Sequence, residues 1–244
     1  MLDTPSSMDG EARKERDRTS MERTKIRRRY AVALAGVVLY LVLDIVAQLL
    51  PPHYSPISQA ESDLAVGPFG YIMAVNFLNR GLLSLEFLFA FMGTVRLTNG
   101  NVSQYRRGTF LLGVWSVGAV LLALFPTDVP STPVSWHGAI HLVVAIIAFI
   151  GGAFGALLVS VRMGGNRTLQ RARRFALPIS ELAVVLCLIE LLGPFFAPHI
   201  ASRFGGLFER LFLGAVLLWM SSISVYMLRS SNDFLGGSES AHHK

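Results

Sequence analysis

Six apolar runs, each roughly 20 residues long, constrain this chain more than any other feature of its sequence. The runs cover residues 30–50, 71–95, 109–125, 136–161, 175–195 and 207–228. They lack the alternation of apolar and polar residues that a half-exposed helix shows. A helix of this length spans the hydrocarbon core of a bilayer, which is about 30 Å thick. The sequence therefore predicts an all-α bundle of six transmembrane helices in the cell membrane.

Composition agrees with a membrane protein and argues against a nucleic-acid partner. Hydrophobic residues make up 52% of the 244 residues and charged residues 16%, a balance that is rare in soluble domains. The net charge is +6, but the basic residues gather just outside the apolar runs, where anionic lipid headgroups attract them. The lipid bilayer is thus the expected partner. The single cysteine, Cys187, lies within an apolar run, which excludes an intrachain disulfide and favours a packing role.

The chain divides into one transmembrane domain and two polar ends. Residues 1–29 are rich in charge and have no apolar periodicity, so we expect a disordered basic arm in the cytoplasm. Residues 30–228 form the six-helix domain, and residues 229–244 form a flexible cytoplasmic tail. The first apolar run is too long for the core of a signal peptide, and no clear cleavage site follows it, so we expect it to be retained as a helix.

The placement of basic residues predicts the orientation of the bundle. The arm carries nine Lys and Arg residues, the loop after the second run carries three, and the loop after the fourth carries five. The loops after the first and third runs carry none, and the loop after the fifth carries only Arg203. Because basic loops stay in the cytoplasm, both termini are expected there. The loops after the odd-numbered runs then face the external side.

Histidines and carboxylates gather on this external side. Those outside the tail are His53, Glu61, Asp63, Asp128, His137, His141 and His199. The expected cytoplasmic loops carry basic residues instead. A group of titratable residues at the mouth of an apolar bundle is typical of a functional site in a membrane protein.

His137 and His141 are the first candidates for chemistry. Their spacing of four residues places both imidazoles on one face of a helix, one turn apart, and this spacing is common in metal ligation. Ser135 is a natural N-cap of that helix. A divalent metal such as zinc needs a third ligand, and the candidates are Asp128, Glu61 and Asp63. The alternative is structural, with His137 at the membrane interface, His141 bonded to a neighbouring helix and Asp128 in an Asx turn.

The loop after the first apolar run carries signals for a short helix of its own. Ser58-x-x-Glu61 matches a capping box, and Gly67 followed by Pro68 matches a helix stop. Together they predict a surface helix over residues 59–66.

Two short polar stretches supply further candidates. Ser62, between Glu61 and Asp63, is a candidate nucleophile with a histidine as its base. The alternative is that Glu61 closes the capping box and Ser62 is solvated. Glu209 and Arg210 begin the last apolar run. They are either a cap charge and an interfacial anchor, or Glu209 is a further carboxylate of the site.

Arg80 lies within the second apolar run, roughly 15 Å from its external end by helix rise. An unpaired guanidinium at that depth is costly, so the side chain should either face the interior and meet a carboxylate or snorkel outward. Asp44 and Glu190 lie at matching depth, whereas Glu86 lies deeper, and Asn76 shares the face of Arg80. The arginine is either half of a structural ion pair or a clamp for an anionic group of a substrate. In the second case Asn76, Asp44 and Glu190 join it in the substrate site.

Several short motifs together resemble a known family. In chain order they are Asp44, Ser62-Asp63 with Gly67 and Gly70, Phe125-Pro126-x-Asp128, Gly138-x-x-His141 and Gly206-x-x-Glu209-Arg210. In this order and spacing the chain resembles the prokaryotic membrane family catalogued as domain of unknown function 998, over about residues 30–228. The resemblance implies a polytopic membrane protein and carries no assigned reaction.

A more distant similarity is to the alkaline ceramidases and progestin-receptor-like proteins. That superfamily consists of seven-helix membrane hydrolases that hold zinc with three histidines and use a serine and an aspartate. This chain departs from the pattern, because it has six apolar runs and no third histidine within one. The resemblance therefore implies a zinc hydrolase by analogy only.

Three hypotheses about function follow. The first is a membrane-embedded hydrolase that acts on a lipid from the external leaflet, with a metal on His137, His141 and Asp128. Arg80 would then orient an anionic group of the substrate. The second is a non-enzymatic membrane carrier, either of a small molecule or coupled to protons, whose pathway is lined by Arg80, Asp44, Glu86 and Glu190. The third is a membrane scaffold. The sequence does not determine the substrate, the metal or the oligomeric state.

Overall fold

The computed structural model describes residues 5–52, 54–129 and 132–236, and within them it contains six α-helices and no strand. The helices are α1 (Pro5–Leu49), α2 (Gly70–Leu97), α3 (Arg106–Leu124), α4 (Trp136–Arg162), α5 (Arg167–Phe196) and α6 (Pro198–Gly236). Three 3₁₀ helices lie in the connections: η1 (Glu61–Ala65), η2 (Val102–Tyr105) and η3 (Met163–Gly165). His53 and the last part of the tail, residues 237–244, lie outside the described residues.

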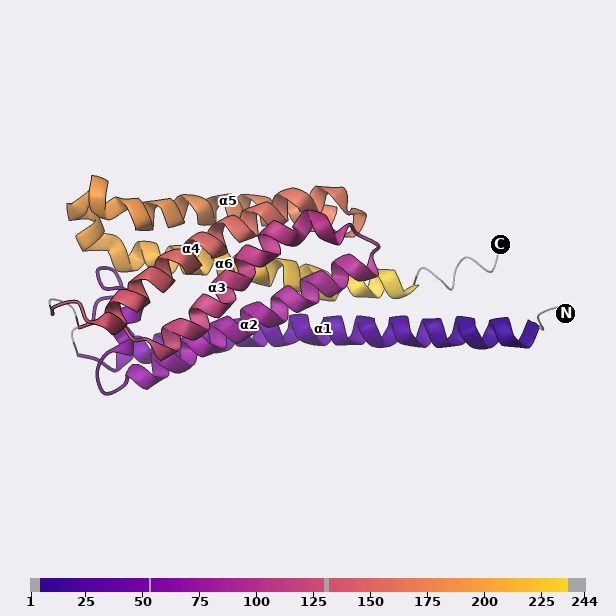
Figure 1. Ribbon diagram of the computed structural model, residues 1–244, viewed down its shortest axis with the longest axis horizontal. Coiled ribbons are helices and arrows are strands. Elements are labelled where there is room, and N and C mark those ends of the chain that lie inside the picture. The colour runs from indigo at the N-terminus through magenta and orange to yellow at the C-terminus, as the bar shows by residue number, and fades with distance from the viewer. Residues whose placement is uncertain (1–4, 53, 130–131, 237–244) are drawn as a thin grey trace.

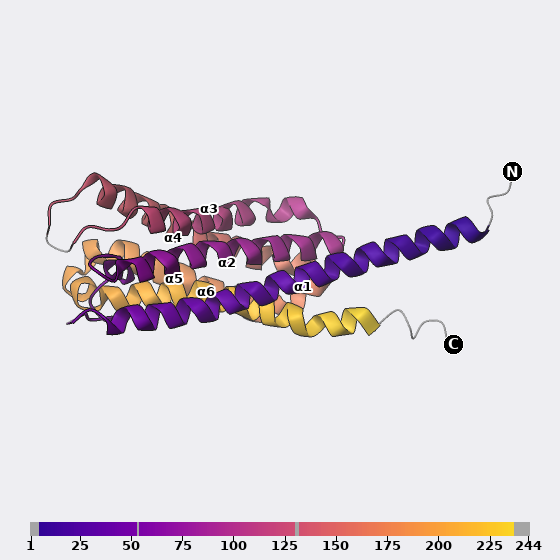
Figure 2. The ribbon, with the colours of Figure 1, turned by 90° about the horizontal axis from the view of Figure 1, so that it is seen from below.

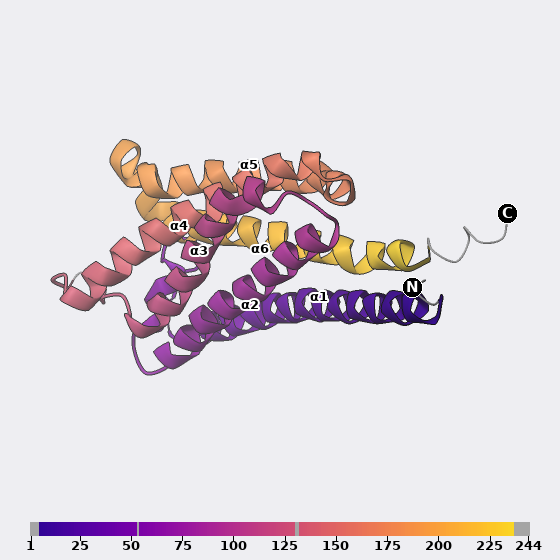
Figure 3. The same ribbon diagram turned by 45° about the vertical axis from the view of Figure 1, so that its right-hand side comes forward.

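Each helix packs against the next along the chain, and α6 returns to α1, so the bundle closes on itself. In Figures 1 and 3, α1 and α2 lie toward one edge of the bundle and α5 toward the other, and Figure 2 shows α3 and α4 together on one face with α1 and α6 on the opposite face. Short connections join antiparallel neighbours, as is usual in helical bundles.

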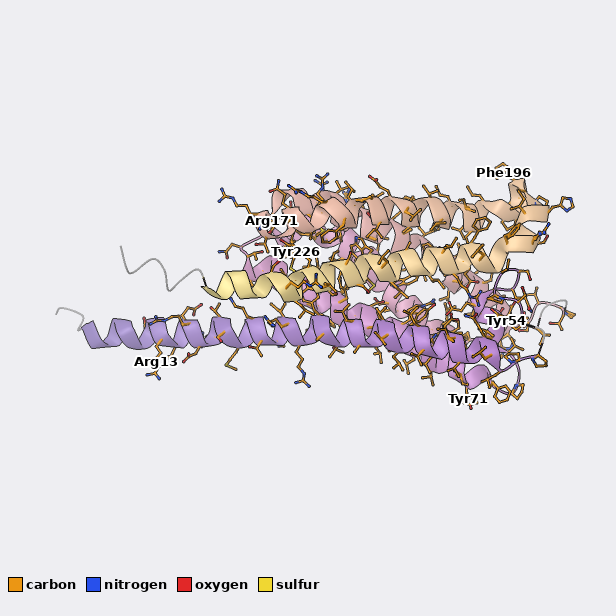
Figure 4. All side chains as sticks on the ribbon, turned by 180° about the vertical axis from the view of Figure 1, so that it is seen from behind. Arg13, Tyr54, Tyr71, Arg171, Phe196 and Tyr226 are labelled. Atoms are coloured by element: carbon orange, nitrogen blue, oxygen red, sulfur yellow. The ribbon has the colours of Figure 1, made fainter. Side chains whose placement is uncertain are left out.

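The bundle has two chemically different ends. The connections α1–α2, α3–α4 and α5–α6 share one end, which we call the Glu61 end. The opposite end, which we call the arginine end, holds the connections after α2 and α4. Figure 4 shows Tyr54, Tyr71 and Phe196 at the Glu61 end and Arg171 and Tyr226 at the arginine end. The alternating basic and non-basic loops of the sequence thus separate to opposite ends.

All six helices are long and apolar enough to cross a membrane. Large aromatic side chains such as Trp115, Trp219 and Phe87 fill the centre, whereas aliphatic side chains such as Leu82 and Leu218 point outward. An apolar outer surface is what lipid contact requires. The prediction of six membrane helices is confirmed, and the chain is a multi-pass integral membrane protein.

The polar ends of the chain differ from the sequence expectation. Helix α1 begins at Pro5, so the arm predicted to be disordered is helical from that residue. It is rich in Arg, Glu and Lys, which favour helix. With 45 residues, α1 is about 68 Å long and extends beyond the other helices at the arginine end (Figures 1 and 2). Likewise, α6 continues to Gly236, into the predicted tail.

The loop between α1 and α2 folds inward and does not carry a surface helix. It contains the 3₁₀ helix Glu61–Ala65, and no side chain caps its N-terminus, so the predicted capping box is wrong. Glu61 is fully buried and its backbone N–H donates to Glu209. The predicted helix stop is confirmed, because Gly67 follows with a φ of 88°, a conformation that favours glycine.

Glycines let the central helices approach closely. A Cβ on Gly81 of α2 would lie 2.6 Å from Val120 Cγ2 and 2.8 Å from the Ser116 carbonyl oxygen of α3. In α4, Gly151 and Gly155 meet the backbone of α3 in the same way. Small residues at such contacts are how helices associate in a membrane, where dispersion replaces the hydrophobic effect.

Replacing Gly81 by Ala tests this close contact. Because the added methyl meets backbone as well as side chain, we expect Gly81→Ala to lower the free energy of unfolding by about 1–3 kcal/mol. Gly113 of α3 is the matched control, since nothing lies within 4 Å of its added Cβ. Gly113→Ala should be neutral or stabilising by up to about 1 kcal/mol, from helix propensity. Unfolding of both variants in detergent measures the difference, and equal effects would contradict the packing argument.

Candidate functional site

A cluster of buried polar side chains lies inside the bundle near the Glu61 end. We call it the Arg80 centre, and its members are Tyr40, Glu61, Asn76, Arg80 and Glu209, all at most 7% exposed. They come from α1, η1, α2 and α6. Buried charge within membrane helices is expensive and marks functional positions. The Arg80 centre is therefore the candidate site of this protein.

Glu61 connects the helices at this centre. Its Oε1 accepts a hydrogen bond of 2.6 Å from the Tyr40 hydroxyl of α1. Its Oε2 lies 3.6 Å from the Arg80 guanidinium of α2. Its backbone N–H donates to Oε2 of Glu209 in α6 at 2.8 Å. One loop residue thus joins three helices through its two carboxylate oxygens and its amide.

Arg80 lies between two aromatic rings. Its guanidinium is 5.0 Å from the ring centre of Phe77 and 5.0 Å from that of Trp115, distances at which a cation is attracted to the ring face. The predictions that Asp44 or Glu190 pairs with Arg80 are wrong, because the carboxylate within ion-pair distance is that of Glu61. The prediction compared only carboxylates within the apolar runs, so it did not consider one that reaches the interior from a loop.

Several polar atoms of the centre lack a hydrogen-bond partner within the described residues. They are Arg80 Nε, Glu61 Oε2, Asn76 Oδ1 and, in α1 nearby, Asp44 Oδ1. The 3.6 Å between Arg80 and Glu61 is longer than a hydrogen bond. Each buried polar atom without a partner costs about 1–3 kcal/mol. This arrangement has donors and acceptors available for a polar ligand.

Glu209 and Arg210 hold the loop against α6. Arg210 donates to the carbonyl oxygens of Pro56 and Gln59, at 3.1 and 3.0 Å, and to the Tyr54 hydroxyl. Gly206, one turn earlier, leaves room for the Gln59 carbonyl, which an added Cβ would strike. Arg210 therefore anchors the loop, while Glu209 faces the Arg80 centre.

Asp128 fixes the entry to α4. Its two carboxylate oxygens accept from the backbone N–H and the hydroxyl of Ser135, at 2.8 and 2.5 Å. The Ser135 hydroxyl in turn accepts from the N–H of Gly138, which confirms Ser135 as the N-cap. A Cβ on Gly138 would strike the Asp128 carboxylate. These hydrogen bonds hold the pKa of Asp128 below its usual value.

The two histidines of α4 lie close to this loop. His141 is buried, and its Nδ1 donates to the Phe125 carbonyl oxygen at 2.7 Å, since a carbonyl only accepts. The rings of His137 and Trp136 are tilted against each other, with centroids 3.4 Å apart, and each lies 6.3 Å from the Phe125 ring. In the described parts of the chain, however, no group of three His, Cys, Asp or Glu side chains is placed to hold a metal ion.

The remaining predicted residues are spread over the Glu61 end and beyond. Ser62 and Asp63 are half-buried in η1, and burial raises the pKa of Asp63. Asp44 accepts a 2.6 Å hydrogen bond from Gln48. Glu190 lines an apolar groove of about 860 Å³ between α5 and α6. Glu86 lies 3.7 Å from Arg29, on the side of the arginine end. The catalytic role proposed for Ser62, Glu61, Asp63 and Asp128 stays a prediction.

Sequence reasoning missed two members of the site. Tyr40 precedes Asp44 by four residues, so the two lie on one face of α1, and that polar pair within an apolar run was a usable signal. Trp115 forms part of the wall around Arg80, and its indole N–H donates to Ser84 at 3.1 Å. No sequence pattern distinguishes Trp115 from other aromatic residues in these runs.

The role of Asp128 makes a prediction about pH. Its lowered pKa means that its hydrogen bonds stabilise the fold above the usual carboxyl pKa of about 4 and lose this effect as pH falls through the lowered value. We therefore expect Asp128→Asn to lower the unfolding temperature in detergent at pH 7 and to have little effect near pH 2.

Asp63 is the matched control, because burial raises its pKa and its charged form disfavours folding above pH 4. Asp63→Asn should leave the unfolding temperature unchanged or raise it at pH 7. If Asp128→Asn reduced stability equally at both pH values, the carboxylate charge would have no part in holding α4.

Comparisons with known proteins identify the family of this chain. The family model described as protein of unknown function (DUF998) matches residues 34–226. Searches of the curated proteins and of the solved structures found no match. The more distant resemblance to the alkaline ceramidases has no support from these comparisons. The match covers all six helices and the Arg80 centre, and the chain therefore belongs to the DUF998 family of membrane proteins, whose function is unknown.

Proposed function

We propose that this protein is a membrane carrier that binds a small anionic solute at the Arg80 centre and moves a proton with it. The observation that supports this most is the buried guanidinium of Arg80. Its Nε has no hydrogen-bond partner in the described residues, and the guanidinium lies 3.6 Å from the Glu61 carboxylate. A pair that served stability alone would be expected to close to hydrogen-bond distance, because burying two charges is costly. The N–H groups of a planar guanidinium match the spacing of the oxygens in a carboxylate or a phosphate, so N–H groups without a partner suit such an anion.

Two buried carboxylates of the Arg80 centre supply the proton-binding part of the proposal. Glu61 and Glu209 are both buried, and the Glu61 amide contacts the Glu209 carboxylate. We place the transported proton on this carboxylate pair. Once a proton is bound, Glu61 attracts Arg80 less strongly, and the guanidinium is free to bind the anion. Proton and anion would then bind together.

The orientation completes the proposal. Arginine-rich connections on one end of the bundle favour the cytoplasm for that end, which would place both termini there and the Glu61 end on the external side of the cell membrane. The Arg80 centre would then be nearer the external mouth. The Glu190 groove between α5 and α6 also lies at this end.

Transport measurements on reconstituted vesicles test the carrier proposal. We expect currents on a solid-supported membrane when small carboxylates or inorganic phosphate are added with a pH gradient. Arg80→Gln should reduce the current at least about tenfold, since one charge-assisted pair is worth about 1.5–3 kcal/mol. Glu209→Gln should keep anion binding but remove the dependence of the current on the pH gradient.

Two controls separate transport from folding. Arg203→Gln removes an exposed arginine at the same end and should keep the full current. The double variant Arg80→Gln, Glu61→Gln removes both charges of the buried pair, so it should fold better than Arg80→Gln alone and still not transport. A current that survives loss of Arg80 would contradict the proposal.

A metal-dependent hydrolase acting on a lipid from the external leaflet is the second candidate. One observation favours it: Nδ1 of His141 donates to a backbone carbonyl, which is how metal-binding histidines are usually fixed, with Nε2 left to bind the metal. His137 and Asp128 are the other ligands this hypothesis requires, and they would have to move closer to His141, since the three side chains are not placed to hold a metal ion in the described structure. Zinc would supply an activated water there.

Metal analysis separates the second candidate from the first. If the hydrolase hypothesis holds, purified protein should contain about one zinc, iron or manganese ion per chain, and His141→Ala should lower this content at least about tenfold. The matched control is His199→Ala, which removes an exposed histidine of the same end. If the purified protein contained no stoichiometric metal and chelators did not affect transport, the carrier hypothesis would remain and the hydrolase hypothesis would be excluded.

A further inference from the structure

A groove of about 550 Å³ lies at the arginine end, where α1 leaves the bundle and passes α2 and α3. Its basic lining residues are Lys25, Arg29, Arg96 and Arg106. These come from three different helices, so the fold itself assembles them. The groove is separate from the Arg80 centre, and the carrier proposal does not use it.

Positive charge exceeds negative charge in this groove. Glu22 is the one acidic residue in its lining, and Glu86 lies 3.7 Å from Arg29 just below it. The carboxylates of Glu22 and Glu86 therefore balance only part of the charge of the four basic lining residues. Lys25, Arg96 and Arg106 are exposed, so their charges are available to a ligand.

The floor of the groove is apolar and aromatic. Phe89 of α2 is 53% exposed and Phe110 of α3 is 69% exposed, and Leu88 and Met92 lie beside them. Arg29 is held over the Phe89 ring at 4.9 Å. By helix rise, Phe89 lies about 10 Å from Arg96 and Phe110 about 6 Å from Arg106, toward the middle of the bundle. The groove thus has a cationic rim above a hydrocarbon-facing floor.

We propose that this groove binds one anionic phospholipid of the adjacent leaflet. Its phosphate would lie between Lys25, Arg96 and Arg106, and an acyl chain would lie along Phe89 and Phe110. Basic pockets between transmembrane helices recognise lipid headgroups in this way. A free phosphate ion would leave the exposed aromatic floor without a role, whereas a phospholipid uses both parts of the groove.

A second basic groove at the same end provides the comparison. It has a volume of about 600 Å³ and is lined by Arg167, Gln170, Arg171, Arg173, Arg174, Leu177 and Pro178. It carries more arginines but no aromatic residue. If charge alone decided lipid binding, this groove would bind at least as well as the first.

Lipid titration of the full chain in neutral detergent tests the proposal, with native mass spectrometry counting bound lipids. We expect phosphatidylglycerol to bind at least tenfold more tightly than phosphatidylcholine with the same acyl chains. The double variant Arg96→Gln, Arg106→Gln should weaken phosphatidylglycerol binding about 10- to 30-fold, from about one kcal/mol per basic residue. The matched variant Arg167→Gln, Arg171→Gln should change it less than threefold.

Each other outcome overturns the proposal. Equal losses in both double variants would mean that general surface charge attracts the lipid. Unchanged binding in the Arg96, Arg106 variant would place the lipid elsewhere. Glycerol phosphate gives a test that needs no variant: if it displaced the lipid at equal concentration, the site would recognise a free anion and not a phospholipid.

Discussion

The burial of the Glu61 carboxylate is the constraint on which the Glu61 end of this bundle depends. Glu61 belongs to a loop, yet it is fully buried and contacts α1 through Tyr40, α2 through Arg80 and α6 through Glu209. Arg80 can remain buried only with such a carboxylate near it, because an unpaired guanidinium in a membrane bundle is costly. The loop must therefore enter the bundle, and the anchoring of that loop by Arg210 and Tyr54 follows from the same requirement.

Most of the short motifs on which the family resemblance rests act on these loops. Gly206 and Gly138 each leave the space that a carbonyl or a carboxylate occupies, and Asp128 and Arg210 supply the hydrogen bonds that close the two loops. Such motifs position the backbone, and every backbone N–H and C=O group within the membrane needs a hydrogen-bond partner. What they do not explain is the polar interior, where several buried atoms have no partner among the described residues.

Sequence reasoning predicted the helices and the Ser135 cap, because apolar length and local capping are properties of neighbouring residues. It placed Arg80 in the interior but not beside Glu61, since the depth argument compared only carboxylates within the apolar runs. The pairing depends on the path of the loop, which the sequence of the loop alone does not determine. The arm was misjudged for a related reason. Its residues lack an apolar face, yet they favour helix individually and continue one that the membrane span has already nucleated.

Stability alone does not account for Arg80 at its position. Phe77 and Trp115 already surround it, and an apolar side chain of similar volume would pack between these rings without a desolvation penalty. Replacing a buried ion pair by apolar residues is often neutral or stabilising. The separation of 3.6 Å makes the ion pair weaker still as a structural element. A guanidinium retained at such a cost, with Asn76 one turn away on the same helix face, is better explained by recognition of a ligand than by the fold that surrounds it.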